Sequence, residues 1–413
     1  MAEKVIRDPL YGFISLEKDE LALKLIDTPE FQRLKHIRQL GVSFVTYPGA
    51  NHTRFSHSLG VYHLSQKLYD LLGRKDDSNG KKVSIAALLH DIGHSPLSHA
   101  FESVLTPGIN HEEWTKRIIN DSATTINEEI RNSIFTPKEI SDLIIKPSNP
   151  TFLHTMISSQ LDVDRFDFLQ RDSLFTGNPS GKFDIKRILR TLQLSDDEDD
   201  LYVQTKGLHS VEGYLISRYH MYNQVYMHPT TVCYEGLLKN IFKLASDLVT
   251  NGDLDLPVTL EKALNRETLS VNEFAQLTDN DVFYALGLWK NAQHVGLNDL
   301  CRRVFTRKLL KPIKNVSIKN YFNNKDNIEN ILESEGFNPD YYLVWVEGGE
   351  KSAYNPYSPD PVDQLNAIIV EGNKDISEKL PNLKYLRIET ENIMGVPEEC
   401  KDGIRGLIMP ENK

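Results

Sequence analysis

Two ionisable residues end the most apolar segment of this chain. Val83 to Leu89 is the richest apolar run, and His90 and Asp91 follow it directly. The run predicts a short helix that is buried on all sides. Burying an imidazole and a carboxylate is unfavourable unless something compensates, and a metal ion would compensate. Imidazole together with carboxylate suits a divalent metal from the set Mn, Fe, Mg, Ni, Co and Zn, and the pattern does not distinguish among them.

Two further segments offer metal ligands. His57 lies at the start of a helix expected over residues 56–72. Asp162 and Asp164 lie in a carboxylate-rich run, and either could complete a set of two histidines and two aspartates. Such a set leaves coordination positions for water and a phosphate oxygen. Taken singly, these residues would be a hydrogen-bonded pair, a capping histidine and an exposed helix face. Together they favour a metal site, because a buried His-Asp pair on an apolar helix has few other partners.

Apolar positions recur at helical spacing through most of the first 250 residues. Helices are predicted over residues 19–27, 56–72, 83–91, 112–119, 137–145, 151–173, 211–227 and 229–248. Another helix should start at Thr28-Pro29, because proline suits the first helical turn. A turn or hairpin is expected over residues 195–203, with a solvated acidic run.

The pattern of apolar residues changes after about residue 254. Helical patterns continue at residues 281–289 and 297–305, and strand-like runs then appear at 341–346, 367–370 and 383–388. We therefore expect a mostly α protein, with an all-helical core in residues 1–250 and a smaller α+β C-terminal domain in residues 251–413.

Composition restricts the setting and the partners of this chain. The net charge of −11 argues against a protein that coats nucleic acid, because such a protein needs a basic face. No apolar run is long enough to span a bilayer, and the charged start does not resemble a signal peptide. Cys233, Cys301 and Cys400 are odd in number and widely spaced, which argues against a disulfide framework. A reducing cytoplasm without membrane contact is the simplest expectation.

Several long motifs occur in a fixed order along the chain. They are VIRDP at residues 5–9, IDTPEFQRL at 26–34, PGANHTRFSHSLG at 48–60, the pair His90-Asp91, and SSQLDVDRFD at 158–167. This order resembles the HD superfamily, and most closely its branch of deoxynucleoside triphosphate triphosphohydrolases. The resemblance covers the chain up to about residue 230 and is weak beyond Ala245.

The resemblance assigns roles to the polar residues of these motifs. It implies four metal ligands, which are His57, His90, Asp91 and Asp164. It places His94 and His99 at the scissile phosphate, and His111 with Glu102 at the attacking water. Imidazoles can move protons near neutral pH, and a carboxylate can orient one of them. Without the family context, His99 and His111 would be read as surface or capping histidines.

A second set of residues is implied to hold a nucleotide substrate. The set comprises Gln39, Arg54, Arg165, Phe168, Asp172, Arg218 and Tyr226. The arginines would neutralise a triphosphate through paired contacts. Tyr226 would form a wall against the ribose 2′-hydroxyl, with Gln39 and Asp172 near the sugar. The family often has Lys at the position of Arg165 and Tyr at that of Phe168, so here the charge is kept but a hydroxyl is lost.

Related enzymes assemble as dimers of dimers, and nucleotides bound between subunits control many of them. The resemblance therefore implies a homo-oligomer. Asp27 and Gln32 match part of the regulatory site, while Lys35 stands where an Arg is common and Arg7 where an Asn is common. A guanine-nucleotide effector is accordingly a hypothesis.

Three functions are compatible with these features. Hydrolysis of dNTPs to deoxynucleoside and inorganic triphosphate is favoured. A second candidate is another HD phosphohydrolase acting on nucleotide monophosphates or signalling nucleotides, although neither a GYP triplet nor an acidic pair follows His90-Asp91. A third is a regulator that binds nucleotide or nucleic acid without catalysis, against which the intact metal-ligand set argues.

Overall fold

Helices α3 (Arg54–Leu71), α4 (Ser78–Leu89) and α10 (Val163–Thr176) form the centre of the N-terminal part of the protein, with α3 packed against both of the others. The computed structural model describes residues 4–16, 19–74, 77–105, 108–145, 150–195, 200–250, 254, 256, 258–352 and 367–409. The last turns of α4 are buried on all sides, as the apolar run predicts.

Shorter helices surround this centre, and a two-stranded hairpin precedes them. The hairpin pairs β1 (Val5–Asp8) with β2 (Gly12–Ser15). The helices are α1 (Glu20–Ile26), α2 (Pro29–Gln32), α5 (His99–Leu105), α6 (His111–Asn120), α7 (Thr125–Arg131), α8 (Pro137–Ile144), α9 (Phe152–Ile157) and α11 (Ile185–Thr191). The side chain of Thr28 caps α2 as expected. The single helix predicted over residues 151–173 is instead α9 and α10, separated by residues 158–162.

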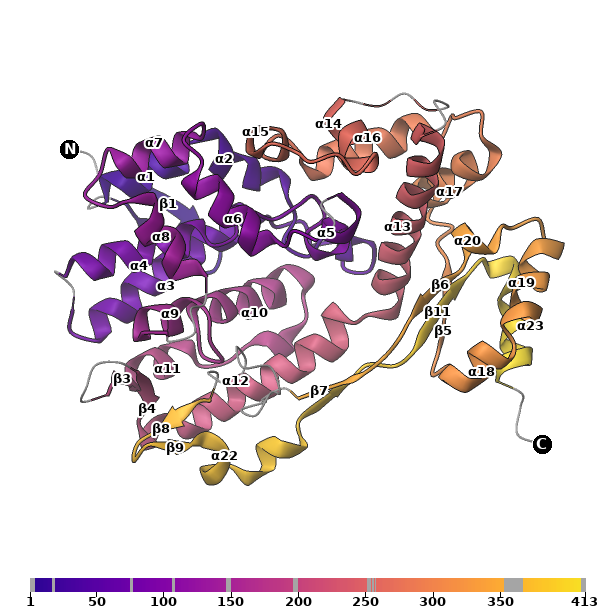
Figure 1. The fold of residues 1–413 in the computed structure, drawn as a ribbon. Coiled ribbons are helices and arrows are strands. Elements are labelled where there is room, and N and C mark those ends of the chain that lie inside the picture. Colours follow the sequence, from indigo (N-terminus) through magenta and orange to yellow (C-terminus); the bar gives the residue numbers. More distant parts are fainter. Residues whose placement is uncertain are drawn as a thin grey trace.

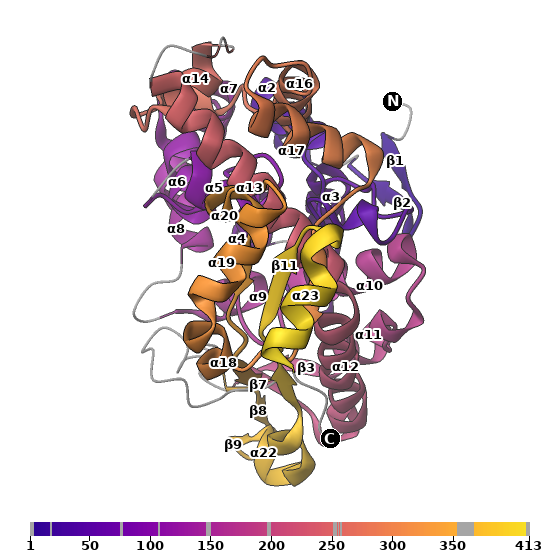
Figure 2. The same ribbon diagram turned by 90° about the vertical axis from the view of Figure 1, so that its right-hand side faces the viewer.

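The helix predicted over residues 211–227 also changes character. α12 (Leu208–Met221) continues into a π-helical turn, Tyr222–Tyr226, before α13 (Pro229–Thr250) begins. α13 stands between the N-terminal helices and the C-terminal sheet, and it contacts α5 on one side and β5, β6 and β11 on the other (Figures 1 and 2). Elements of the N-terminal and C-terminal parts of the chain therefore pack against opposite sides of α13.

The C-terminal part begins with four helices that join the main hydrophobic core. These are α14 (Val258–Leu264), α15 (Val271–Phe274), α16 (Asp279–Trp289) and α17 (Val295–Thr306). A three-stranded antiparallel sheet follows in the order β5–β11–β6, made of Lys311–Lys314, Ile393–Val396 and Val344–Val346. α18 (Ile318–Asn323), α19 (Lys325–Ser334), α20 (Pro339–Tyr342) and α23 (Glu398–Ile408) accompany this sheet. Residues of the sheet and of α18, α19 and α23 form a second, smaller core.

Two small sheets connect this part back to the N-terminal helices. β8 (Ile369–Val370) pairs in parallel with β4 (Leu201–Val203), which pairs antiparallel with β3 (Leu192–Leu194) at the predicted hairpin. β9 (Lys374–Asp375) extends this sheet and leads into α22 (Ile376–Lys379), and β7 (Glu350–Ser352) pairs with β10 (Arg387–Glu389). The acidic residues 196–199 lie outside the described residues.

The mostly α fold class is confirmed. The first 250 residues are not purely helical, however, because they contain the short strands β1, β2, β3 and β4. All three strand predictions were too long: residues 341–346 divide into α20 and β6, residues 383–388 begin with a 3₁₀ turn before β10, and only Ile369–Val370 of residues 367–370 form a strand, β8. The division at residue 250 stays a prediction. All three cysteines are buried and unbonded. Among the described residues, none of the helices combines the length and apolar character that a membrane crossing requires.

Candidate metal centre and catalytic cleft

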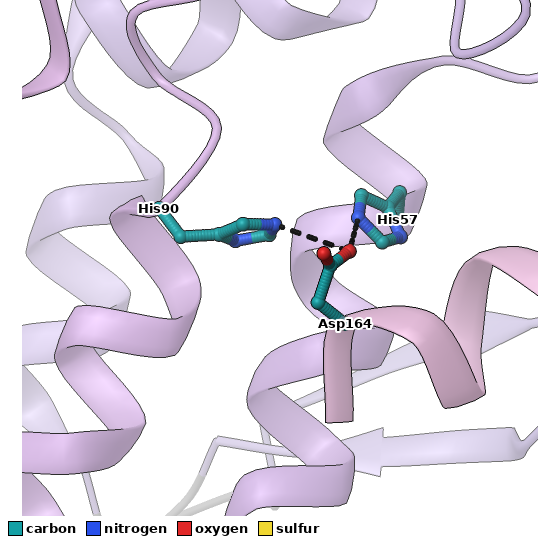
Figure 3. Close-up of side chains that lie close together, drawn as sticks. All are labelled: His57, His90 and Asp164. Carbon is teal, nitrogen blue, oxygen red and sulfur yellow. Dashed lines mark ion pairs between the residues drawn. The ribbon is translucent and has the colours of Figure 1, made fainter. Parts of the chain in front are cut away.

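Three helix ends bring the candidate metal ligands together. His57 lies in the first turn of α3, and Asp164 lies in the first turn of α10. His90 is the residue at which α4 ends, and Asp91 follows it. Because α3 packs against α4 and α10, side chains more than 100 residues apart in the sequence face one point (Figure 3).

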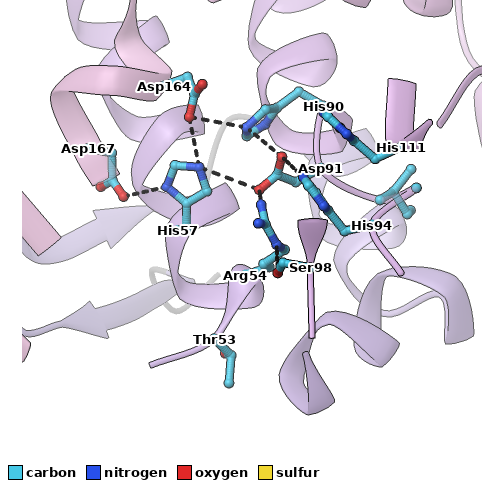
Figure 4. Close-up of polar contacts among 12 residues, drawn as sticks. Thr53, Arg54, His57, His90, Asp91, His94, Ser98, His111, Asp164 and Asp167 are labelled. Atoms are coloured by element: carbon cyan, nitrogen blue, oxygen red, sulfur yellow. Dashed lines mark hydrogen bonds and ion pairs between the residues drawn. The ribbon is translucent and has the colours of Figure 1, made fainter. Parts of the chain in front are cut away.

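Asp164 and Asp91 both contact the two imidazoles. Oδ1 of Asp164 lies 3.0 Å from Nε2 of His57 and 3.6 Å from Nε2 of His90. Asp91 lies on the other side, with Oδ2 3.6 Å from Nε2 of His57 and Oδ1 3.3 Å from Nε2 of His90 (Figure 4). Donor atoms of His57, His90 and Asp164 all fall within 4.8 Å of one another, which a single cation could bridge.

The chemistry of this donor set fits a divalent cation. Nε2 of His57 and Nε2 of His90 are buried, and in the described part of the chain they contact carboxylate oxygens without the geometry of a hydrogen bond. Burial lowers the pKa of His57, but contacts with Asp164, Asp167 and Asp91 outweigh it and raise that pKa to about 10. The carboxylates around His57 therefore favour a positive charge between the imidazole rings of His57 and His90. A cation would supply that charge and displace the proton from imidazole.

Hydrogen bonds behind the rings aim both Nε2 atoms at this point. Nδ1 of His57 lies 2.8 Å from Oδ2 of Asp167, and Nδ1 of His90 lies 2.8 Å from the carbonyl oxygen of Ala87. Such contacts select the ring tautomer in which Nε2 is a ligand. Sequence reasoning gave Asp167 no role, although its position three residues after Asp164 on a helix was a usable signal.

The structure separates the two aspartates that residue type and spacing left as alternatives and between which the resemblance preferred Asp164. Asp162 is the residue before α10, where its Oδ1 accepts the N–H of Arg165 at 2.7 Å and its Oδ2 accepts the N–H of Ser159 at 2.8 Å. Its carboxylate therefore caps a helix, in the manner common for Asp at this position. Asp164 alone of the pair reaches the histidines.

Arg54 forms a buried ion pair with Asp91. Its Nη1 donates to Oδ2 of Asp91 at 2.5 Å, and its Nε donates to Oγ of Ser98 at 2.9 Å. Burial raises the pKa of Asp91, but Arg54 and the neighbouring histidines hold it well below its usual range. Asp91 is therefore ionised, as a metal ligand must be.

A second histidine cluster lies beside this centre. Nδ1 of His111 lies 3.0 Å from Oε1 of Glu102, and Nδ1 of His94 lies 3.7 Å from the same oxygen. These donor atoms are close enough for a cation. However, the two rings stack with centroids 4.1 Å apart at an interplanar angle of 11°. Lone pairs in two parallel planes cannot converge on one ion, so the arrangement suits proton transfer better than metal binding.

Gly93 brings these rings together. A β-carbon at Gly93 would lie 2.2 Å from the carbonyl oxygen of His111 and 2.2 Å from the backbone nitrogen of Thr115. The φ of Gly93 is not in the left-handed region, so close approach of α6 is the reason for glycine here. His99 begins α5, and its side chain lies outside the described part of the structure.

Residues distant in sequence hold the loop that carries His94. Leu97 and Ser98 have φ of 55° and 57°, which non-glycine residues adopt uncommonly. The N–H of Leu97 donates to Oδ1 of Asp279, at the start of α16, at 2.7 Å. Arg33 donates to the carbonyl oxygen of His94 at 2.8 Å. No local motif indicates Asp279, so sequence reasoning missed this support.

Two of the metal-ligand candidates, Asp91 and Asp164, line a cleft of about 390 Å³. Its lining includes most of the implied substrate residues, namely Gln39, Arg54, Arg165, Phe168, Asp172 and Tyr226. Tyr226 donates to Oδ2 of Asp172 at 2.8 Å, and Oδ1 of Asp172 lies 2.7 Å from Nε2 of buried His52. Arg218 does not line the cleft, because its Nη1 donates to Oε1 of Gln160 at 2.5 Å.

The implied regulatory residues form a separate group at the first helices. Gln32 donates to the carbonyl oxygen of Ile26 at 2.7 Å and accepts from Nζ of Lys35 at 2.6 Å. Asp27 is exposed at the end of α1. None of the three lines the cleft.

Known proteins are similar to this chain in sequence and in fold. The family model described as HD domain matches residues 54–159, and the one described as HD associated region matches residues 183–336. YwfO of Bacillus subtilis (strain 168) is 36% identical over 387 residues, covering 91% of this chain and 87% of that protein. The crystal structure of a phosphohydrolase from Bacteroides thetaiotaomicron VPI-5482 has a TM-score of 0.83 and 31% identity, covering 96% of this chain and 100% of that one.

A more distant relative carries a named activity. The deoxynucleoside triphosphate triphosphohydrolase SAMHD1 of Homo sapiens is 30% identical over 285 residues, with 60% of this chain and 45% of the human protein covered. Fold, donor set and relatives together define a hydrolase with a helical HD core. This chain belongs to the HD-domain phosphohydrolase family.

Proposed function

We propose that this protein hydrolyses dNTPs to deoxynucleoside and inorganic triphosphate. The observation that carries the proposal is the single cleft that joins Asp91, Asp164 and His94 at one end to Asp172 and Tyr226 at the other. A nucleotide needs a metal-binding end for its phosphates and an end with polar groups that can contact the hydroxyls of its sugar. The likeness to SAMHD1 supports the same substrate class.

The metal-binding end would hold the α-phosphate. A divalent cation bound by His57, His90, Asp91 and Asp164 would supply Lewis-acid assistance to attack at phosphorus. Its identity among Mn, Fe, Mg, Ni, Co and Zn stays open. Arg54 and Arg165 line the same cleft and offset the negative charge that develops on the phosphate oxygens.

The second histidine cluster, which contains His94, Glu102 and His111, would transfer the protons. The oxygen of water bonds to the α-phosphorus, one proton of that water passes to His111, and Glu102 holds the ring in place. The bond from phosphorus to the 5′ oxygen of the nucleoside breaks, this oxygen takes up a proton from solvent, and His111 returns its proton to solvent. Burial, Arg54 and His111 keep the pKa of His94 well below its usual range. Its neutral ring would therefore donate a hydrogen bond to the scissile phosphate without adding charge.

The test is product analysis. Purified protein is incubated with each dNTP and NTP plus Mn or Mg, and products are separated by anion-exchange chromatography. Inorganic triphosphate should appear from dNTPs and should vanish in a His90→Ala/Asp91→Ala variant. His209→Ala removes an exposed histidine outside the cleft and should keep the activity. Absence of triphosphate from every nucleotide, with metal bound and GTP or dGTP also added, would contradict the proposal.

Other outcomes identify the alternatives. Release of phosphate from nucleotide monophosphates or signalling nucleotides alone would indicate a different HD phosphohydrolase. Nucleotide binding without turnover in the metal-loaded protein would indicate a regulator.

Assembly and regulation extend the proposal. We expect a homo-oligomer arranged as a dimer of dimers, with a guanine nucleotide bound near Asp27, Gln32 and Lys35. Activity should then rise when GTP or dGTP is titrated, and light scattering should report the tetramer. A flat titration would remove the effector from the proposal.

A further inference from the structure

A second chamber opens beside the sugar end of the catalytic cleft. It has a volume of about 370 Å³ and shares Gln39, Leu40 and Tyr226 with the cleft. This volume lies within the range of small-molecule sites, roughly 300–1,000 Å³. In the proposed function Tyr226 contacts the sugar, so the group attached to that sugar would reach the second chamber first.

Two charged side chains of α13 line this chamber. Glu235 and Lys239 are four residues apart and therefore share one face of the helix. Both are partly buried, and neither side chain has a hydrogen bond or ion pair within the part of the chain that the structure describes. Burial raises the pKa of Glu235 to about 6, while Lys239 opposes the rise. A sheltered carboxylate without a donor is unfavourable, so the chamber suits a ligand that brings donors.

Glu235 and Lys239 determine which hydrogen-bond donors and acceptors a bound ligand must present to them, and in which order. A carboxylate accepts two parallel hydrogen bonds, and an ammonium donates but cannot accept. The complementary edge carries two adjacent donors followed by an acceptor. Guanine has this edge, with its N2 amine, N1–H and O6. Adenine and cytosine each place an acceptor beside a single amine, and thymine places one N–H between two carbonyls.

We propose that this chamber is the base-binding pocket of the enzyme and that it selects guanine. Glu235 accepts from N1–H and the N2 amine, and Lys239 donates to O6. The inference rests on the proposed function, because it assumes that phosphate and sugar occupy the neighbouring cleft. It assigns to Glu235 and Lys239 a role in specificity and none in the chemical step.

The test measures binding rather than turnover, so that its failure is distinct from failure of the hydrolase proposal. Wild-type protein is titrated with 2′-deoxyguanosine, 2′-deoxyadenosine and 2′-deoxycytidine, and binding is followed by saturation-transfer NMR. Glu235→Gln keeps the shape of the side chain but replaces one acceptor by a donor. Deoxyguanosine binding should weaken by about 10- to 100-fold, the discrimination typical of one paired contact to a base.

The same variant should bind deoxyadenosine at least as well as wild type, because an amide matches the donor and acceptor of adenine. Lys239→Met should weaken deoxyguanosine binding and leave deoxycytidine unchanged. Glu333→Gln, an exposed residue of α19, serves as the matched control and should change nothing. Circular dichroism verifies folding. Equal affinity of the wild type for the three nucleosides, no binding of deoxyguanosine, or unchanged deoxyguanosine binding in Glu235→Gln would each overturn the proposal.

Discussion

Oδ2 of Asp167 lies 2.8 Å from Nδ1 of His57, on the side of the ring opposite the candidate metal centre (Figure 4). The same oxygen accepts Nε of buried Arg171 at 2.8 Å, and Arg171 in turn reaches Oδ2 of Asp8 at 2.8 Å. The carboxylate that orients His57 is therefore itself held by a buried ion-pair chain that reaches the first strand.

Asp167→Asn should weaken metal binding. Loss of a carboxylate that orients a ligating histidine lowers metal affinity by about 10- to 100-fold. Isothermal titration with Mn²⁺ would measure this. Asp8→Asn is the matched control, because it weakens the same Arg171 network without touching His57. If both variants lose affinity equally, general loosening of the network rather than ring orientation is responsible.

Gly60→Ala should damage both stability and metal binding. A β-carbon at Gly60 would lie 1.9 Å from Oδ1 of Asp167 and 2.5 Å from Nη2 of Arg171. Overpacking of this kind lowers the free energy of unfolding by roughly 1–3 kcal/mol. Thermal unfolding would report the loss. Gly213→Ala on α12 meets open space and should instead stabilise slightly, as alanine does in a helix. A wild-type Tm in Gly60→Ala would contradict the packing at this position.

His111→Ala should lower kcat for triphosphate release by about 10²- to 10⁴-fold, the usual contribution of a general acid or base. Its metal content, measured by inductively coupled plasma mass spectrometry, should equal that of the wild type. The reason is that His111 stacks parallel to His94 and cannot direct a lone pair to a shared ion. A drop in bound metal would show that His94, Glu102 and His111 hold a second cation.

Glu235→Gln should raise the Tm more at pH 8 than at pH 5. Burial raises the pKa of Glu235 from 4.5 to about 6 in the folded protein. The wild type is therefore fully stabilised by this group below pH 4.5 and loses that stability as the pH rises through 6. Glutamine has no charge to bury at any pH. Differential scanning fluorimetry at the two pH values, with Glu333→Gln as control, measures the effect, and an equal Tm change at both pH values would exclude it.

Local signals in the sequence were sufficient for several features. The apolar run before His90 produced a buried helix that ends at Leu89, because apolar composition and helical periodicity are local properties. Thr28 and Pro29 indicated the start of α2 for the same reason. The break between α9 and α10 was also within reach, since Asp162 caps the residues that follow it.

The predictions were weakest where contacts between distant segments decide the structure. Residues 341–346 were expected to form one strand, but only Val344–Val346 pairs with β11, since Tyr341 and Tyr342 belong to α20. The π-helical turn before α13 has no sequence signal that we recognise. It displaces Tyr226 from the regular helical spacing and lets its hydroxyl reach Asp172.

The sequence by itself determined the helical core, the His-Asp pair at its centre and the list of candidate ligands, because residue type and short spacing carry that information. Only the tertiary structure decided that Asp164 faces the histidines, that Asp279 holds the loop of Leu97, and that Glu235 lines a chamber beside Tyr226. Those relationships join residues far apart in the chain. They depend on how helices pack, which no local pattern encodes.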